Sequence, residues 1–274
     1  NPNIRNDFAA HLKEEYPHLI SIDFTLPSAV NDNADFYCRQ GLPFVMGTTG
    51  GDRVALEERV KNSGVVAVIA PNMAKQIVGF MEVMQEFAEQ HPGKLKNVML
   101  EIKESHQATK NDFSGTAIKV AEYFRQLGIL DTDVKMDNTC KIRDVAAQLN
   151  MRVPKQYLSA HGWHTYTVMT KDGKSNYFVT QLKDDLLAFL ESPVFDGYAR
   201  VYDRNFVQRT SPDGNVMFSL QYLSRGRGLT QKHNINGRAP YGLGTVEAVR
   251  FLHPKALSGE QGKMYTMIDM MKGK

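Results

Sequence analysis

The residues best suited to chemistry lie in one short stretch, EIKESHQATKNDFSGTA, at positions 101–117. It carries His106 and Lys110 ahead of Ser114-Gly115-Thr116, where an amphipathic helix begins. The free N–H groups and the dipole of a helix N-terminus favour a carboxylate or a phosphate, and a histidine can donate a proton near neutral pH. The stretch therefore predicts a site that binds an anion and protonates it. The same spacing also fits a serine N-cap, a surface lysine and a hydrogen-bonded loop histidine.

The composition sets broad limits on the partners of the chain. Its 274 residues carry a formal net charge of +3, which suits an anionic ligand and does not indicate nucleic acid. No apolar run approaches the roughly 18 residues that indicate a membrane span. The two cysteines, Cys38 and Cys140, provide no disulfide framework and indicate a reducing compartment, with each interpreted as a free structural thiol. These limits favour a small anionic molecule as the ligand.

Strands and helices alternate through the first part of the chain. Buried strands are predicted for LISIDF at 19–24, for PFVM at 43–46 and for VVAVIA at 65–70. Helices are predicted between them, at 27–40 and 54–64. This alternation predicts βαβ units and a parallel sheet that is covered on both faces.

The carboxyl ends of these three strands are the expected ligand-binding edge of the sheet. Glycine and threonine there allow close backbone approach to a flat or phosphorylated ligand and supply N–H and hydroxyl donors. Each end alone also fits an ordinary tight turn. The residues at these ends are Phe24, Thr25, Gly47, Thr48, Thr49, Ala70 and Asn72.

The pattern changes after Asn72, which is predicted as the N-cap of a long amphipathic helix. The next strand, NVMLEIKE at 97–104, alternates apolar and polar residues and is predicted to be half exposed. We therefore predict two domains, residues 1–72 with 239–274 returning to them as helix, and residues 73–238. Within the second domain, strands are expected at 163–170, 175–182, 198–210 and 216–224, with a short helix at 184–192.

The stretch ESHQATKNDFSGTA at 104–117 resembles the signature of the dihydrodipicolinate reductase family in its plant-type branch, E-S-H-Q-x-x-K-x-D-x-S-G-T-A. Other segments resemble family segments in family order. They are IDFTLPSAVNDNADFY, GLPFVMGTTGGDR, VIAPNMAKQIVGFM, KHNINGRAPYGLGTVEAVRFL and MYTMIDMM.

The resemblance implies an α/β fold, with a Rossmann-like nucleotide-binding domain and a mixed-sheet α+β domain that binds substrate and builds a homotetramer. It implies an enzyme of lysine (diaminopimelate) biosynthesis that reduces a cyclic dihydrodipicolinate-type dicarboxylate with NADPH or NADH. A plant or algal member is expected in the chloroplast stroma and any other in the cytoplasm. By family position, His106 and Lys110 are proton donors. Substrate contacts are expected from Gln107, Ser114, Gly115, Thr116 and Arg238, and the seven strand-end residues are expected to contact the cofactor.

Three features depart from the family pattern. The first βα unit and its G-x-x-G-x-x-G turn have no counterpart, so we expect sequence upstream of Asn1 to supply them. Gln107 replaces a second histidine of bacterial members, and segment 171–215 is longer than its family equivalent and is expected to form an extra hairpin and helix. His161 and His164 lack a cysteine or carboxylate at usable spacing, so no metal site is predicted. The alternative function is a reductase-like structural or assembly subunit, such as one of a chloroplast NADH dehydrogenase-like complex.

Overall fold

A computed structural model describes residues 2–48 and 50–273 of the chain. The chain forms two compact units, which are described separately. Unit 1 runs up to Val78 and resumes at Tyr241, and unit 2 spans Gly79–Pro240. Helix α4 (Lys75–Gln90) begins in unit 1 and continues in unit 2.

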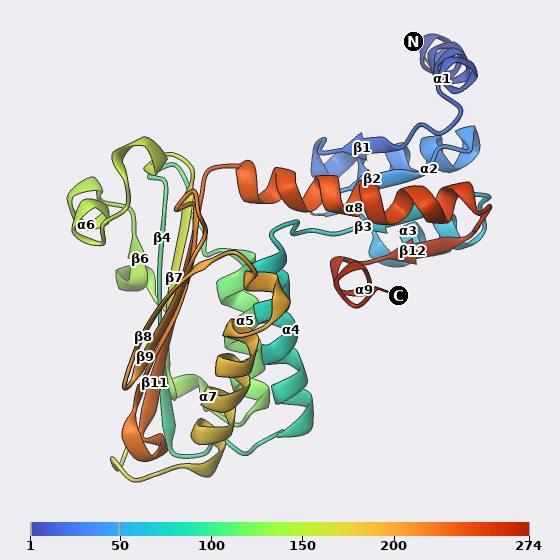
Figure 1. The fold of residues 1–274 in the computed structure, drawn as a ribbon. Helices are drawn as coiled ribbons and strands as arrows, with labels where there is room; N and C mark the ends of the chain where they lie inside the picture. Colours follow the sequence, from blue (N-terminus) through green and yellow to red (C-terminus); the bar gives the residue numbers. More distant parts are fainter. Residues whose placement is uncertain (1, 49, 274) are drawn as a thin grey trace. The chain divides into compact units, whose positions relative to one another are not determined.

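Unit 1 is built on a parallel sheet with strand order β1-β2-β3-β12, as Figure 1 shows. This confirms the predicted parallel α/β arrangement. The strands are β1 (Ser21–Asp23), β2 (Phe44–Met46), β3 (Val66–Ile69) and β12 (Lys263–Tyr265). The helices are α1 (Pro2–Glu15), α2 (Val30–Gln40), α3 (Arg53–Lys61), α8 (Ala239–Leu257), which begins at the end of unit 2, and α9 (Met267–Met271).

Alternation along the strands divides the core of unit 1 between the two faces of the sheet. Phe44 and Met46 of β2 pack with residues of α2 and α3, while Val45 between them packs with Ala248 and Leu252 of α8. Both helices on the first face have clear end signals. Gly41 ends α2 in the left-handed conformation (φ 63°), and the Asp52 side chain accepts from two backbone N–H groups at the start of α3.

Three predictions for unit 1 were wrong in detail. The first strand covers only Ser21–Asp23, and Ile22 is 54% exposed because β1 is the edge strand of this sheet. Asn72 is not a helix N-cap, since α4 begins at Lys75 and the Asn72 side chain accepts from the Ala74 N–H in the turn before it. The final segment is not wholly helical, because β12 pairs with β3 before α9 begins.

Unit 2 is built on a mixed eight-stranded sheet with order β5-β4-β7-β11-β10-β9-β8, and β6 also pairs with β4. The helices α4, α5 and α7 lie along one face of this sheet (Figure 1). The strands are β4 (Val98–His106), β5 (Val134–Lys135), β6 (Lys141–Ile142), β7 (His161–Thr170), β8 (Ala199–Asp203), β9 (Phe206–Thr210), β10 (Val216–Leu223) and β11 (Gly228–Asn236). Its other helices are α5 (Gly115–Gln126), α6 (Val145–Asn150) and α7 (Tyr177–Leu190).

The central strands of unit 2 bring distant polar residues together. Strand β4 alternates as predicted, with Leu100 and Ile102 on the buried face, and Glu104 continues this face at 0% exposure. In the antiparallel register Glu104 lies opposite His164 of β7, and His164 lies opposite His233 of β11. A carboxylate and two imidazoles therefore lie side by side at buried positions of neighbouring strands.

The strand predicted at 175–182 was wrong, because residues 177–182 belong to helix α7. Asn176 caps this helix by accepting from the Phe178 and Val179 N–H groups. The spacing of the buried Val179, Leu182 and Leu186 is that of a helix face. Segment 171–215 thus contributes a helix and the hairpin of β8 and β9. In the part of the chain that the structure describes, no helix is long and apolar enough to cross a membrane.

Candidate functional site

The candidate site lies where β4 ends at His106 and the chain turns into α5. Ser114 starts α5 as its N-cap, with Oγ accepting from the Ala117 N–H at 3.1 Å. Apolar residues at helical spacing, including Val120 and Phe124, bury one face of α5. The turn between the two elements is thus held at both ends, by sheet pairing and by helix packing.

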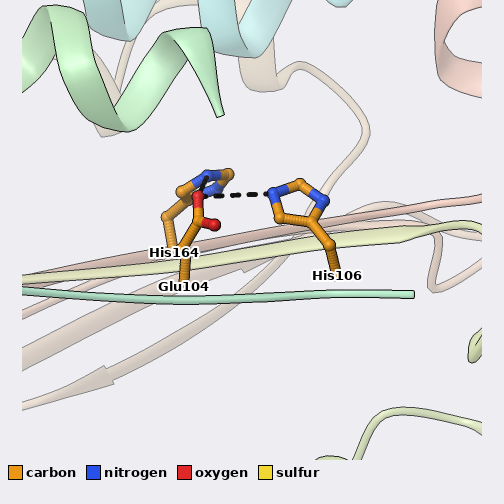
Figure 2. Close-up of side chains that lie close together, drawn as sticks. All are labelled: Glu104, His106 and His164. Atoms are coloured by element: carbon orange, nitrogen blue, oxygen red, sulfur yellow. Dashed lines mark ion pairs between the residues drawn. The ribbon is translucent and has the colours of Figure 1, made fainter. Parts of the chain in front are cut away.

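Glu104 is the centre of the site and is completely buried. Its Oε1 accepts from Arg143 Nη2 at 2.5 Å, and its Oε2 accepts from the Ser114 N–H at 2.9 Å. The Nε2 atoms of His106 and His164 approach Oε2 at 3.6 and 3.5 Å (Figure 2). Burial alone would raise the pKa of Glu104, but the nearby imidazoles of His106 and His164, together with hydrogen bonds from the Ser114 N–H and Arg143, outweigh it and hold the pKa well below its usual value. The carboxylate is therefore ionised.

The orientation of His106 follows from its other ring nitrogen. His106 Nδ1 lies 3.1 Å from the carbonyl oxygen of His161. Because a carbonyl oxygen only accepts, Nδ1 carries a proton, and Nε2 is left facing Glu104. This buried Nε2 has no hydrogen-bond partner of ordinary length among the described residues. An imidazole nitrogen held in this way is placed to exchange a proton with a bound ligand.

A chain of buried polar side chains continues from His164 into the sheet. Its Nδ1 lies 3.0 Å from His233 Nε2, and His233 Nδ1 lies 3.4 Å from Gln231 Nε2. Burial lowers the pKa of His164 and holds that of His233 well below its usual value. His161 is a separate case, in which burial also lowers the pKa; its ring bonds Ser105 Oγ at 2.9 Å and the Tyr157 carbonyl. These imidazoles are neutral.

Glu104, His106 and His164 also form a group that could hold a metal ion. Their 3.5 and 3.6 Å separations are close to the roughly 3.4 Å expected between tetrahedral ligands of zinc. The charge balance argues against a metal ion at this group. Arg143 and the N-terminus of α5 already neutralise Glu104, so a second cation would meet repulsion. The surroundings favour an anion beside the cluster. His164 does have a carboxylate partner, which sequence spacing did not reveal.

The structure brings some of the predicted substrate-site residues together. His106 and Ser114 both contact Glu104 Oε2. Ser114 Oγ also lies 2.7 Å from His164 Nε2, so both Ser114 groups are engaged internally and the adjoining residues Gly115 and Thr116 remain on the outer side of the helix start. Lys110 Nζ pairs with the exposed Asp112 at 2.8 Å. That pair is exchangeable, because surface ion pairs contribute little.

Two further predicted substrate residues are not joined to the cluster by any bond between described side chains. Gln107 is half-buried in the loop, and its carbonyl accepts from the Lys110 N–H. Arg238 is exposed between β11 and α8. The predicted roles of all seven substrate-site residues stay predictions.

The predicted cofactor residues lie at the carboxyl ends of β1, β2 and β3 in unit 1, apart from Thr49, which falls outside the described residues. The Phe24 ring is 54% exposed and lies against Gly47, where an added Cβ would collide with it. Thr48 Oγ1 donates to the Thr25 carbonyl, which ties the first two ends together. Ala70 is buried, and Asn72 is half-buried. This edge offers an exposed flat ring beside a glycine, and a larger residue there would displace the ring.

Arg143, Gln148 and His233 were missed by sequence reasoning. Nothing in the sequence near Arg143 or Gln148 connects them with residues 104–112. Glu104 carried a usable signal, because it continues the apolar alternation of β4. A carboxylate at a buried strand position requires compensating donors, so this alternation already indicates polar partners for Glu104.

Comparisons with known proteins give a consistent result. A family model described as "Dihydrodipicolinate reductase, N-terminus" matches residues 2–73. Two rice proteins (Oryza sativa subsp. japonica) are similar along the chain. "Probable 4-hydroxy-tetrahydrodipicolinate reductase 1, chloroplastic" is 37% identical over 99% of this chain and 64% of its own length. The corresponding reductase 2 is 36% identical over 99% of this chain and 67% of its own length. The chain spans 62 to 67% of the lengths of four plant relatives.

Among solved structures, dipicolinate-bound dihydrodipicolinate reductase from Paenisporosarcina sp. TG-14 has a TM-score of 0.49 and 14% identity to this chain. The match covers 94% of this chain and 75% of that one.

Proposed function

The chain belongs to the dihydrodipicolinate reductase family, and on this premise we propose that it reduces a cyclic dihydrodipicolinate-type dicarboxylate with NAD(P)H. The observation that carries the proposal is the placement of His106 Nε2 against the ionised Glu104, beside the N-terminus of α5. A helix N-terminus attracts a carboxylate, and a histidine can act as a general acid toward the bound ring. Both properties are what reduction of an anionic, unsaturated ring requires.

Protonation is the contribution of unit 2 to this reaction. Net reduction adds a hydride and a proton to the substrate ring. His106 would supply the proton from Nε2, which faces Glu104, while its Nδ1 stays fixed on the His161 carbonyl. Lys110 would exchange its surface partner Asp112 for a substrate carboxylate and act as a second donor. The N–H groups of Gly115 and Thr116 at the start of α5 would bind the carboxylate as well.

The strand ends of unit 1 fit a nicotinamide cofactor. NAD(P)H, when bound, supplies the hydride. The exposed Phe24 ring offers a flat surface for stacking, Gly47 permits close backbone approach, and Thr25 is exposed beside them. We propose these residues, with Thr48, Ala70 and Asn72, as the cofactor contacts.

The experiment is a steady-state assay of the full-length protein with freshly made dihydrodipicolinate and NADPH or NADH. Lys110→Ala should lower kcat/KM by roughly 10²–10⁴-fold, because a positioned proton donor contributes that much. The matched control is Lys119→Ala, which removes an exposed lysine paired with Glu122 on α5 and should leave the rate within about twofold of the wild type. Equal rates for the two variants would contradict the role of Lys110. A wild-type protein without reductase activity or NAD(P)H affinity would contradict the proposal and favour the structural-subunit alternative.

Two wider properties accompany this proposal. The plant relatives are named as chloroplastic, and we propose the same compartment for this chain if its source is plant or algal. We also propose a homotetramer, as the family resemblance implies. Light scattering of the purified full-length protein tests the assembly, and a dimer or monomer at micromolar concentration would contradict it.

A further inference from the structure

A short segment far along the chain holds the loop that carries Lys110. We name residues 141–148 the brace; they comprise β6, Arg143 and the first part of α6. The side chains of three brace residues donate hydrogen bonds to backbone carbonyls of residues 104–112. The donors are Lys141, Arg143 and Gln148.

Arg143 makes most of these contacts. Its Nε donates to the Lys110 carbonyl at 2.9 Å, and its Nη2 donates to the Asp112 carbonyl at 3.2 Å. Its Nη1 lies 3.4 Å from the Glu104 carbonyl, and its Nη2 also binds the buried Glu104 carboxylate. One guanidinium thus connects the loop with the carboxylate that faces His106. Only the planar, multi-donor shape of arginine can satisfy this set of acceptors together.

The other two donors secure the ends of the same loop. Gln148 is 1% exposed, and its Nε2 donates to the His106 carbonyl at 2.6 Å. Lys141 Nζ donates to the Asn111 carbonyl at 3.0 Å and lies over the Phe113 ring. The brace therefore binds the loop from its start to the residues before α5.

The hydrogen bonds from the brace determine which backbone groups of the loop can face an anion. In a trans peptide the carbonyl of one residue and the N–H of the next point in opposite directions. With the carbonyls of Lys110, Asn111 and Asp112 bound to the brace, the following N–H groups point away from it. The loop then presents N–H groups, which attract a carboxylate, in place of carbonyl oxygens, which repel one.

We propose that Arg143 is a positioning residue for dicarboxylate binding, acting through the brace on the loop that carries His106 and Lys110. This proposal rests on the proposed function. It predicts that loosening the brace weakens the dicarboxylate far more than the nicotinamide nucleotide, because the nucleotide contacts proposed above lie on unit 1.

The test compares Arg143→Ala, Arg143→Lys and Gln148→Leu in the full-length protein, with Arg125→Ala as the matched control. Arg125 pairs with the exposed Asp131 on the same unit and does not touch the loop. Calorimetry with pyridine-2,6-dicarboxylate should show Kd raised about 10- to 100-fold in Arg143→Ala, as expected for one or two lost hydrogen bonds to a charged group. Arg143→Lys should recover part of this loss, and NADPH affinity should stay within about twofold of the wild type.

Hydrogen exchange of residues 105–114 supplies a second measurement that does not need the ligand. These amides should exchange faster in Arg143→Lys and Gln148→Leu than in the wild type and in Arg125→Ala. Unchanged exchange, or dicarboxylate Kd within twofold of the wild type in Arg143→Ala, would overturn the inference. A wild type that binds no dicarboxylate while exchange responds as expected would refute the proposed function and leave the brace as a device for loop geometry.

Discussion

Replacing Glu104 with glutamine tests the centre of the site with little change of shape. The carboxylate accepts from Arg143 Nη2 and from the Ser114 N–H, on different oxygens. A glutamine keeps one accepting oxygen, and its NH₂ group must then face one of these two donors. A hydrogen bond to a charged group contributes about 1.5–3 kcal/mol, and an unsatisfied buried donor adds its desolvation cost. Because the uncharged amide is cheaper to bury, the net loss in free energy of unfolding should be about 2–4 kcal/mol.

The assay is equilibrium unfolding in urea at pH 7, with Glu101→Gln as the matched control. Glu101 lies three residues earlier on β4, is 32% exposed at its side chain and pairs with Lys103 and Lys135 on the surface. Glu101→Gln should lower the free energy of unfolding by no more than about 1 kcal/mol, as for other surface pairs. Similar losses for the two variants, with unchanged m-values, would refute the view that Glu104 is a compensated buried charge.

The pH dependence of this difference gives a second check. The pKa of Glu104 is lowered in the folded protein, so its stabilising contribution is complete above the unfolded carboxyl pKa of about 4.3 and is lost as pH falls toward the folded value. The gap in unfolding free energy between wild type and Glu104→Gln should stay constant from pH 7 to pH 5 and narrow below about pH 4. A gap that already narrows near pH 6 would show that histidine protonation governs it instead.

Two further predictions concern the histidines and the cofactor edge. Burial lowers the pKa of His161, His164 and His233, so below about pH 6.5 the unfolded chain binds protons that the folded chain does not. The free energy of unfolding should therefore fall as the pH drops below about 6.5, by up to roughly 1.4 kcal/mol per pH unit for each histidine. Equal urea midpoints at pH 7.5 and pH 5.5 would contradict this prediction. Gly47→Ala forces the Phe24 ring to move, so NADPH affinity should fall about tenfold or more while the fold persists. A Kd for NADPH within twofold of the wild type by calorimetry would exclude Phe24 and Gly47 from the cofactor site.

Local patterns in the sequence were sufficient to predict much of the fold. Strand–helix alternation predicted the parallel sheet of unit 1, and period-two alternation predicted β4. The failure at 175–182 has a physical cause. Tyr177, Phe178 and Val179 are residues with strong strand preference, but the Asn176 cap and the packing of the following leucines make them the first turn of α7. Tertiary packing overrode local propensity there.

The candidate site was predictable only along one segment. His106, Lys110 and Ser114 lie within a single loop, so their spacing in the sequence already indicated a shared role. Their partners come from other strands, through antiparallel register and through the brace. Arg143 lies 39 positions from Glu104, and no local pattern encodes that pairing. Long-range pairing of charged groups is a property of the folded sheet rather than of any window of sequence.

The chain of buried side chains that leads to Glu104 has a direction set by chemistry. Gln231 Nε2 can only donate to His233 Nδ1, so the proton of His233 is on Nε2 and points to His164 Nδ1. The proton of His164 is then on Nε2, facing Ser114 Oγ and Glu104 Oε2, which is the tautomer that an ionised carboxylate prefers. Because the chain ends in an amide that does not titrate, it orients His164 and has no route to deliver or remove a proton. His106 lies outside this chain of side chains and therefore remains the proposed proton donor of the cluster.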